Sequence, residues 1–157
     1  MDQLLDNNLD NEQSGYSQYA TFGQRLVAVL IDGIILYIFQ MIIGFALGLG
    51  MMNDPTIFEE GIPTTFYIYY LIILAGQVAY YAVLESGEKQ ATFGKQAMGI
   101  VVTDVRGNRI STLNAVGRYF AKIPSAMILL IGYFMQPFTE KKQALHDMIA
   151  GTLVYKK

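Results

Sequence analysis

Two long uncharged apolar runs constrain this chain more than any other feature of its sequence. Residues 33–53 form 21 consecutive residues without a charged side chain, and residues 61–84 form 24 more. About 20 residues, each rising about 1.5 Å, suffice for a helix to cross the ~30 Å hydrocarbon core of a bilayer. We therefore predict two transmembrane helices, the first over residues 26–52 and the second over residues 61–84.

The composition favours the same class of protein. Hydrophobic residues make up 53% of the chain and charged residues 15%, against about 25% charged residues in an average soluble domain. The net charge of −2 gives no indication of nucleic-acid binding. The chain has no cysteine and a single histidine, which excludes disulfides and Cys-ligated metals. We find no nucleophile–base pair and no metal-ligand spacing, so we expect no enzyme and no cofactor.

The N-terminal segment differs from a secretory signal. Residues 1–24 contain four acidic side chains and no Lys or Arg, whereas a signal begins with a basic region. We predict a polar, acidic, mobile leader over residues 1–18 and a membrane domain over residues 19–157. The loop 51–65 carries acids and no Lys or Arg, while the loop 85–114 is basic. The positive-inside rule therefore places the N-terminus and the second loop in the cytoplasm.

A third apolar block, residues 115–139, permits two interpretations. A helix starting near Ala115 can cross the membrane once, but this leaves Lys141, Lys142 and the C-terminal lysines on the outer side, against the positive-inside rule. A hairpin of two short helices that enters and leaves on the cytoplasmic face avoids that conflict, and we favour it. The predicted fold is therefore an all-α membrane protein with two transmembrane helices and this third block.

A small β element is expected on the cytoplasmic side. Residues 99–104 are β-branched and alternating, and a turn-like segment follows them. Ile110 and Thr112 are candidates for a return strand, and residues 152–155 form a further candidate strand. Residues 94–99 contain glycines and a lysine without the context of a phosphate-binding loop, so we interpret them as a short interfacial helix ending at a glycine.

Arg25 and Asp32 are the strongest candidates for chemistry. They lie seven residues apart, about 10.5 Å along a helix axis and within about 20° of the same face. An acid below the membrane surface rarely faces lipid, so Asp32 should pair with a cation or hold a proton. Both states suit a group that exchanges a proton for a cation. The structural alternative is a buried ion pair between helices.

Asp147 is a second acid of interest. Alone, it suits a helix cap or a solvated salt bridge, and the neighbouring His146 suits an interfacial histidine that titrates near neutral pH.

Several short motifs in a fixed order identify a family. The chain resembles the RDD family of small bacterial membrane proteins, named for one arginine and two aspartates, and Arg25, Asp32 and Asp147 match these three positions. The resemblance spans residues 16–156. The motifs that carry it are Ala20-Thr21-Phe22-Gly23-Gln24-Arg25, Leu30-Ile31-Asp32, Ala91-Thr92-Phe93-Gly94-Lys95, Gly99-Ile100-Val101-Val102, Gly107-Asn108-Arg109-Ile110-Ser111, Arg118, Gln143-Ala144-Leu145-His146-Asp147 and Ala150-Gly151-Thr152.

The resemblance implies two functions and a location. Some members of the family act as sodium, lithium or potassium ion/proton antiporters, and others act as partners of larger membrane proteins. It also implies that Arg25, Asp32 and Asp147 meet near the cytoplasmic face of a bacterial plasma membrane. We expect a cation/proton antiporter or a subunit of one; the alternative is a non-transporting membrane adaptor or regulator. Two or three crossings rarely enclose a pathway, so an antiporter would be a homo-oligomer.

Weaker candidates concern helix packing. Gly44 and Gly48 form a GxxxG pattern, and Ala75 and Ala79 form a small-xxx-small pattern, both of which let helices approach closely within or between chains. Gln40 and Gln77 are polar at membrane depth. We expect them to bond each other between helices or to line an ion path.

Overall fold

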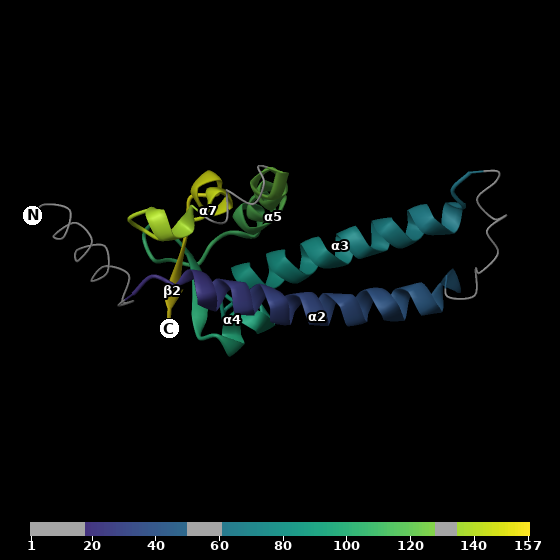
Figure 1. The fold of residues 1–157 in the computed structure, drawn as a ribbon, viewed down its shortest axis with the longest axis horizontal. Helices are drawn as coiled ribbons and strands as arrows, with labels where there is room; N and C mark the ends of the chain where they lie inside the picture. The colour runs from purple at the N-terminus through teal and green to yellow at the C-terminus, as the bar shows by residue number, and fades with distance from the viewer. Residues whose placement is uncertain (1–17, 50–60, 128–134) are drawn as a thin grey trace, which may run out of the picture.

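Two long helices form the backbone of the fold. The computed structural model describes residues 18–49, 61–127 and 135–157, so the predicted leader lies almost wholly outside the described residues. Helix α2 spans Phe22–Ala46 and helix α3 spans Thr64–Ser86. Both helices are long and apolar enough to cross a membrane, with 25 and 23 residues. Figure 1 shows them running side by side away from the rest of the chain.

The start of α2 is fixed by its sequence. The Thr21 side chain accepts a hydrogen bond from the Gln24 backbone N–H, and the Gln24 side chain accepts one from the Thr21 backbone N–H. This reciprocal capping satisfies two donors that the first helical turn leaves open, so α2 begins four residues earlier than predicted. The predicted second helix is confirmed with small shifts, since α3 begins three residues later and ends two residues later.

Of the small residues predicted to pack helices together, only some lie at the contact between α2 and α3. A Cβ on Gly44 would lie 3.6 Å from the Tyr69 ring, so Gly44 does face α3. Gly48 instead follows the C-cap of α2 at φ +71°, where it ends the helix. Ala75 and Ala79 are exposed and are wrong as contacts between α2 and α3. Gly76 of α3 does approach α2 closely, since a Cβ there would lie 2.7 Å from the Phe39 ring.

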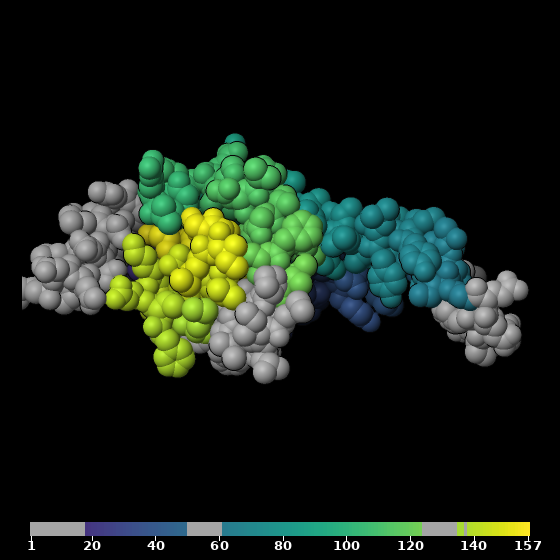
Figure 2. Space-filling model, turned by 90° about the horizontal axis from the view of Figure 1, so that it is seen from above, coloured from purple at the N-terminus to yellow at the C-terminus, as the bar shows by residue number. Residues whose placement is uncertain are grey.

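The remaining elements gather at the end where α2 begins and α3 ends, and we call them the cap (Figures 1 and 2). They are α4 (Phe93–Ala97), β1 (Ile100–Asp104), α5 (Thr112–Met127), the 3-10 helix η3 (Gln136–Phe138), α7 (Leu145–Ile149) and β2 (Thr152–Lys156). The predicted short helix before Gly99 is confirmed as α4, and Gly99 follows it at φ +62°.

The sheet of the cap joins segments far apart in the sequence. β1 and β2 are antiparallel, with Val102 opposite Val154. The segment before α2 adds to the other edge of β2, since the Ala20 N–H donates to the Val154 carbonyl at 2.8 Å. The predicted strands at 99–104 and 152–155 are therefore confirmed. The return strand at Ile110 and Thr112 is wrong, because Ile110 lies in no strand and Thr112 starts α5.

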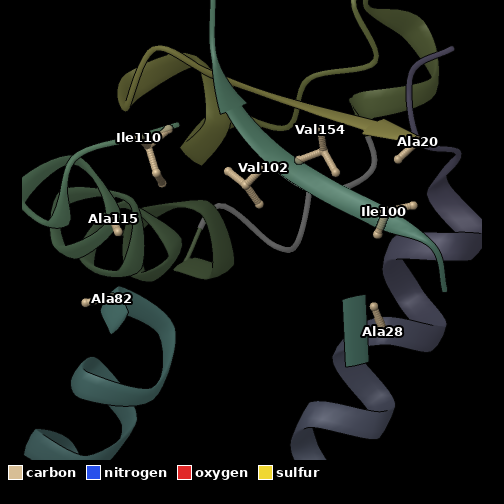
Figure 3. Close-up of a cluster of buried hydrophobic side chains, with 8 residues drawn as sticks. All are labelled: Ala20, Ala28, Ala82, Ile100, Val102, Ile110, Ala115 and Val154. Atoms are coloured by element: carbon tan, nitrogen blue, oxygen red, sulfur yellow. The ribbon is translucent and has the colours of Figure 1, made fainter. Parts of the chain in front are cut away.

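A small aliphatic cluster holds the sheet to the helices. Val102 and Val154 of the sheet belong to one buried cluster with Ala28 of α2, Ala82 of α3 and Ala115 of α5 (Figure 3). Alanines at the three helix positions let the helix backbones approach closely, which places polar side chains of different helices within reach of one another.

The third apolar block returns to the end that it left. The Gln136 amide donates to the Ala20 carbonyl at 3.1 Å, which brings the chain after α5 back beside the start of α2. A single crossing would put Gln136 at the far end of the long helices, so that alternative is wrong. The tip of the favoured hairpin, residues 128–134, lies outside the described residues.

Helix α5 has a charged residue on its covered side and large apolar residues on its exposed side, the reverse of an amphipathic helix on a soluble protein. Its covered side carries Arg118 and two small alanines, while Leu113, Phe120 and Ile123 are 79%, 45% and 51% exposed. α5 also packs against α3, where the Tyr119 hydroxyl donates to Gln77 at 2.9 Å, well inside the apolar run. An apolar outer face at this level suits the boundary between lipid chains and headgroups.

This arrangement predicts that α5 contacts lipid. The chain has no tryptophan, so Phe120→Trp introduces a single tryptophan whose emission can be excited selectively over the tyrosines. In bilayers we expect its emission to be blue-shifted and quenched by lipids with brominated chains. Arg106→Trp, at an exposed position in the turn after β1, serves as the control. Its emission should be neither blue-shifted nor quenched. Equal emission and quenching of the two variants would show that the outer face of α5 does not meet lipid.

Candidate functional site

Asp147 is held between two arginines from different helices. It lies in α7 and is fully buried. Its Oδ2 atom pairs with Arg25 of α2, and its Oδ1 atom lies 2.5 Å from Nη2 of Arg118 in α5. The Ala144 backbone N–H also donates to Oδ2 at 3.2 Å, so Asp147 caps its own short helix. The predicted cap and the predicted ion pair therefore coexist in one carboxylate, and the pair is buried rather than solvated.

The two guanidinium groups fix the charge of Asp147. Burial alone would raise the pKa of this carboxyl, but the nearby charges of Arg118 and Arg25 outweigh burial and hold the pKa well below its usual range. His146 lies beside it, with Nε2 3.5 Å from Asp147 Oδ1. Burial and the surrounding cations lower the pKa of His146 to about 3. Titration near neutral pH is therefore wrong for His146, which stays uncharged there.

The ionic contacts continue beyond Asp147. Arg118 also reaches Glu85 at the end of α3, with 3.5 Å between Nη1 and Oε2. Glu85 in turn pairs with Lys95 of α4. The row Arg25, Asp147, Arg118, Glu85 and Lys95 therefore takes one side chain from each of α2, α7, α5, α3 and α4, and we call it the ionic row. Its cations and carboxylates alternate, so each buried charge has an opposite charge beside it.

Sequence reasoning did not identify Glu85 or Lys95 as site residues. Glu85 is the first charged residue after the 24 uncharged residues of the second apolar run. An acid that ends such a run on the side of the basic loop was the available signal. Its contact with Lys95, ten residues later, depends on the turn after α3 that places α4 against α2.

Asp32 is held in a different way. Its Oδ1 atom accepts hydrogen bonds from the Tyr80 hydroxyl at 2.7 Å and the Gly94 N–H at 2.8 Å, and its Oδ2 atom accepts one from the Thr92 hydroxyl at 2.6 Å. Asp32 is fully buried, yet no cation of the described chain lies within ion-pair distance. The expected meeting of all three family residues is therefore wrong. Arg25 and Asp147 meet, and Asp32 binds the start of α4.

No hydrogen bond joins Gln40 to Gln77 in the described part of the chain, so the expected bond between them is wrong. The Gln77 side chain instead accepts one from Tyr119 of α5. Within the described ranges, no group of three or more His, Asp or Glu side chains could hold a metal ion. The site consists of a fixed ionic row and one separate carboxylate that is surrounded by hydrogen-bond donors.

The ionic row predicts a large loss of stability when the Asp147 carboxylate, which lies between two arginines, is removed. In Asp147→Asn, Arg25 and Arg118 would share a buried site without the charge that separates them. Breaking one partner of a buried ion pair costs about 3–5 kcal/mol, and we expect a loss of this size in the free energy of unfolding. Denaturant unfolding in detergent micelles measures it. Glu140→Gln removes an exposed acid and should change the stability by less than about 0.5 kcal/mol. Similar losses in both variants would contradict the central role of Asp147.

The contact between Asp32 and α4 predicts a second effect. A Cβ on Gly94 would collide with the Ala28 carbonyl oxygen and lie 2.9 Å from Cγ of Asp32. We expect Gly94→Ala to destabilise the protein by about 1–3 kcal/mol because α4 must move away from α2. Gly117 lies in α5 with nothing within 4 Å of an added Cβ. Gly117→Ala should therefore stabilise it by about 0.5–1 kcal/mol. The same unfolding assay compares them, and a neutral Gly94→Ala would show that α4 is not held this closely.

The comparisons with known proteins identify the family of the chain. The RDD family model matches residues 19–151, which include every residue of the ionic row and Asp32. An uncharacterized protein, YxaI of Bacillus subtilis (strain 168), is 38% identical over 148 residues, covering 87% of this chain and 97% of that relative. No solved structure matches the chain. With the family model matching most of its length, the chain belongs to the RDD family.

Proposed function

We propose that the chain exchanges a monovalent cation (Na⁺, Li⁺ or K⁺) for protons across a membrane, as a homo-oligomer or as a subunit of an exchanger. The observation that carries this proposal is the isolation of Asp32. Of the buried carboxylates in the described chain, Glu85 and Asp147 contact fixed cations, and Asp32 contacts only neutral donors. Its charge is therefore the one that a mobile ion can compensate.

The surroundings of Asp32 suit either a proton or a small cation. Burying a carboxylate without a counter-ion is costly, and hydrogen bonds offset part of that cost. A proton on the carboxyl, or a small cation beside it, would remove the remaining charge. Tyr80 and Thr92 hold hydroxyl oxygens at 2.7 and 2.6 Å from the carboxylate. Hydroxyl groups accept as well as donate, so the same oxygens can turn toward a cation.

The proposed location is the bacterial plasma membrane, with the cap and the N-terminus in the cytoplasm. Support comes from the charges at the two ends of the long helices. The cap end carries exposed Lys89, Arg106, Arg109 and Lys142, and the loop between α2 and α3 carries acids and no Lys or Arg. Lys and Arg concentrate on the cytoplasmic side of membrane proteins.

A second function, a non-transporting adaptor that binds a larger membrane protein, has its own support. Ala75 and Ala79 lie one turn apart and are exposed on α3, where small residues allow another helix to approach. The ionic row is a fixed contact that needs no mobile ion. An adaptor would use Asp32 only to hold α4 against α2.

Ion exchange can be measured with purified protein in vesicles that contain a pH-sensitive dye, by adding Na⁺, Li⁺ or K⁺ outside. We expect a cation-driven pH change with the unchanged protein, and its loss in Asp32→Asn, whose side chain cannot carry the exchanged charge. Glu88→Gln removes an exposed acid near the same end of α3 and should exchange like the unchanged protein.

Folding and insertion must be matched before these rates are compared, because Asp32 also holds α4. Asp32→Glu keeps the charge and displaces it by one methylene, so we expect exchange with an altered apparent ion affinity. Exchange by Asp32→Asn at the rate of the unchanged protein would rule out the assigned role of Asp32. Absence of exchange in the oriented, oligomeric protein itself would favour the adaptor.

A further inference from the structure

Lys122 occupies an unusual position beside the ionic row. It lies in α5, one turn after Arg118, and its side chain is partly covered. The ammonium nitrogen lies 3.6 Å from the ring centroid of Tyr81 and 5.9 Å from that of Tyr119. No carboxylate of the described chain lies within ion-pair distance of it. The faces of two aromatic rings take the place of a counter-ion.

Lys122 adds to a surplus of positive charge in this region, and it has no carboxylate of the described chain within ion-pair distance. The carboxylates that act on it are Glu85 of α3 and Asp147 of α7, and the cations are Lys95 of α4 and Arg118 of α5. Glu85 already pairs with Lys95 and Arg118, and Asp147 already pairs with Arg118 and with Arg25 of α2. With Lys122 protonated, four cations surround two carboxylates. The neighbouring His146 is neutral and adds no charge to this balance.

We propose that the Lys122 amine is the site at which this cluster binds and releases a proton. Arginine does not lose its proton in proteins, so Arg25 and Arg118 keep their charge. Burial lowers the pKa of Lys95 as well, but its direct ion pair with Glu85 opposes that shift, and Lys122 has no such pair within the described chain. Release from Lys122 leaves a neutral amine over the Tyr81 ring and reduces the surplus positive charge by one. The proton leaves to solvent, and no bond between heavy atoms changes.

The pKa of Lys122 agrees with this assignment. Burial lowers the pKa of this amine, Glu85 opposes the shift, and Lys95 and Arg118 add to it, which brings the pKa to about 7. An exposed lysine titrates near 10.4. The assignment does not depend on ion exchange at Asp32, because it follows from contacts within the cap and α3.

Trace labelling of amines measures this protonation directly. Only the neutral amine reacts with acetic anhydride, so the labelled fraction of each lysine-containing peptide, followed by mass spectrometry across pH 5–11, gives the midpoint for that lysine. We expect a midpoint near 7 for Lys122, against about 10.4 for an unperturbed lysine. A midpoint above 9 for Lys122 would overturn the proposal.

Unfolding in detergent micelles gives a second, independent measurement. At pH 7 about half of the folded molecules, and above pH 7 most of them, lack the proton that Lys122 holds in the unfolded state, so raising the pH favours folding. The folded-to-unfolded ratio of the unchanged protein should rise about fiftyfold between pH 7 and pH 9, relative to Lys122→Met. Lys142→Met, the matched control, should retain the rise. If Lys122 proves unreactive at every pH, this comparison decides, and parallel pH profiles for Lys122→Met and the unchanged protein would refute the proposal.

Discussion

The ionic row is the interaction on which the rest of the structure depends. Asp147 joins α7 to α2 through Arg25 and to α5 through Arg118, and Glu85 extends the contacts from α5 to α3 and α4. The aliphatic cluster beneath the sheet consists mostly of small side chains, so dispersion and burial alone give it modest strength. The buried ion pairs fix how the elements are oriented around this weak core, because each charged side chain must lie beside one of opposite charge. Any element that moved away would leave a buried ion uncompensated, at a cost of several kcal/mol.

The separation of Asp32 from the ionic row divides the buried acids into two kinds. A carboxylate between two guanidinium groups cannot accept a proton at physiological pH, so Asp147 is suited to holding helices together. The Asp32 carboxylate accepts from two hydroxyls and one backbone N–H and has no fixed cation of the described chain beside it. Its donors can also reorient, whereas a guanidinium cannot give up its charge. The three residues that name the family therefore have two different physical roles in this chain.

The parts of this fold that follow from local patterns could be predicted from the sequence. The two long helices follow from uncharged length, and the strands of the sheet follow from β-branched alternation near residues 99–104 and 152–155. The partners of the charged residues could not be predicted in this way. A spacing of seven residues places Arg25 and Asp32 near one face of α2. The partners of Asp32, however, are Thr92 and Gly94, which the turn after α3 brings to it. Spacing within one helix carries no information about which other element covers that face.

The inverted polarity of α5 explains why a charged cluster can exist at this level of the molecule. The helix turns Arg118 and Lys122 toward α3 and leaves Leu113 and Phe120 outside, so its charges are covered by protein and its apolar face covers the cluster from the other side. Low local polarity strengthens each ion pair and disfavours any cation without a partner. The covering that stabilises the ionic row is therefore the same covering that makes the proton on Lys122 labile. The Tyr81 ring lies beneath that amine, and its neighbour Tyr80 donates to Asp32. The two adjacent tyrosine rings of α3, which contact each other edge to face, therefore join the surroundings of Lys122 to those of Asp32.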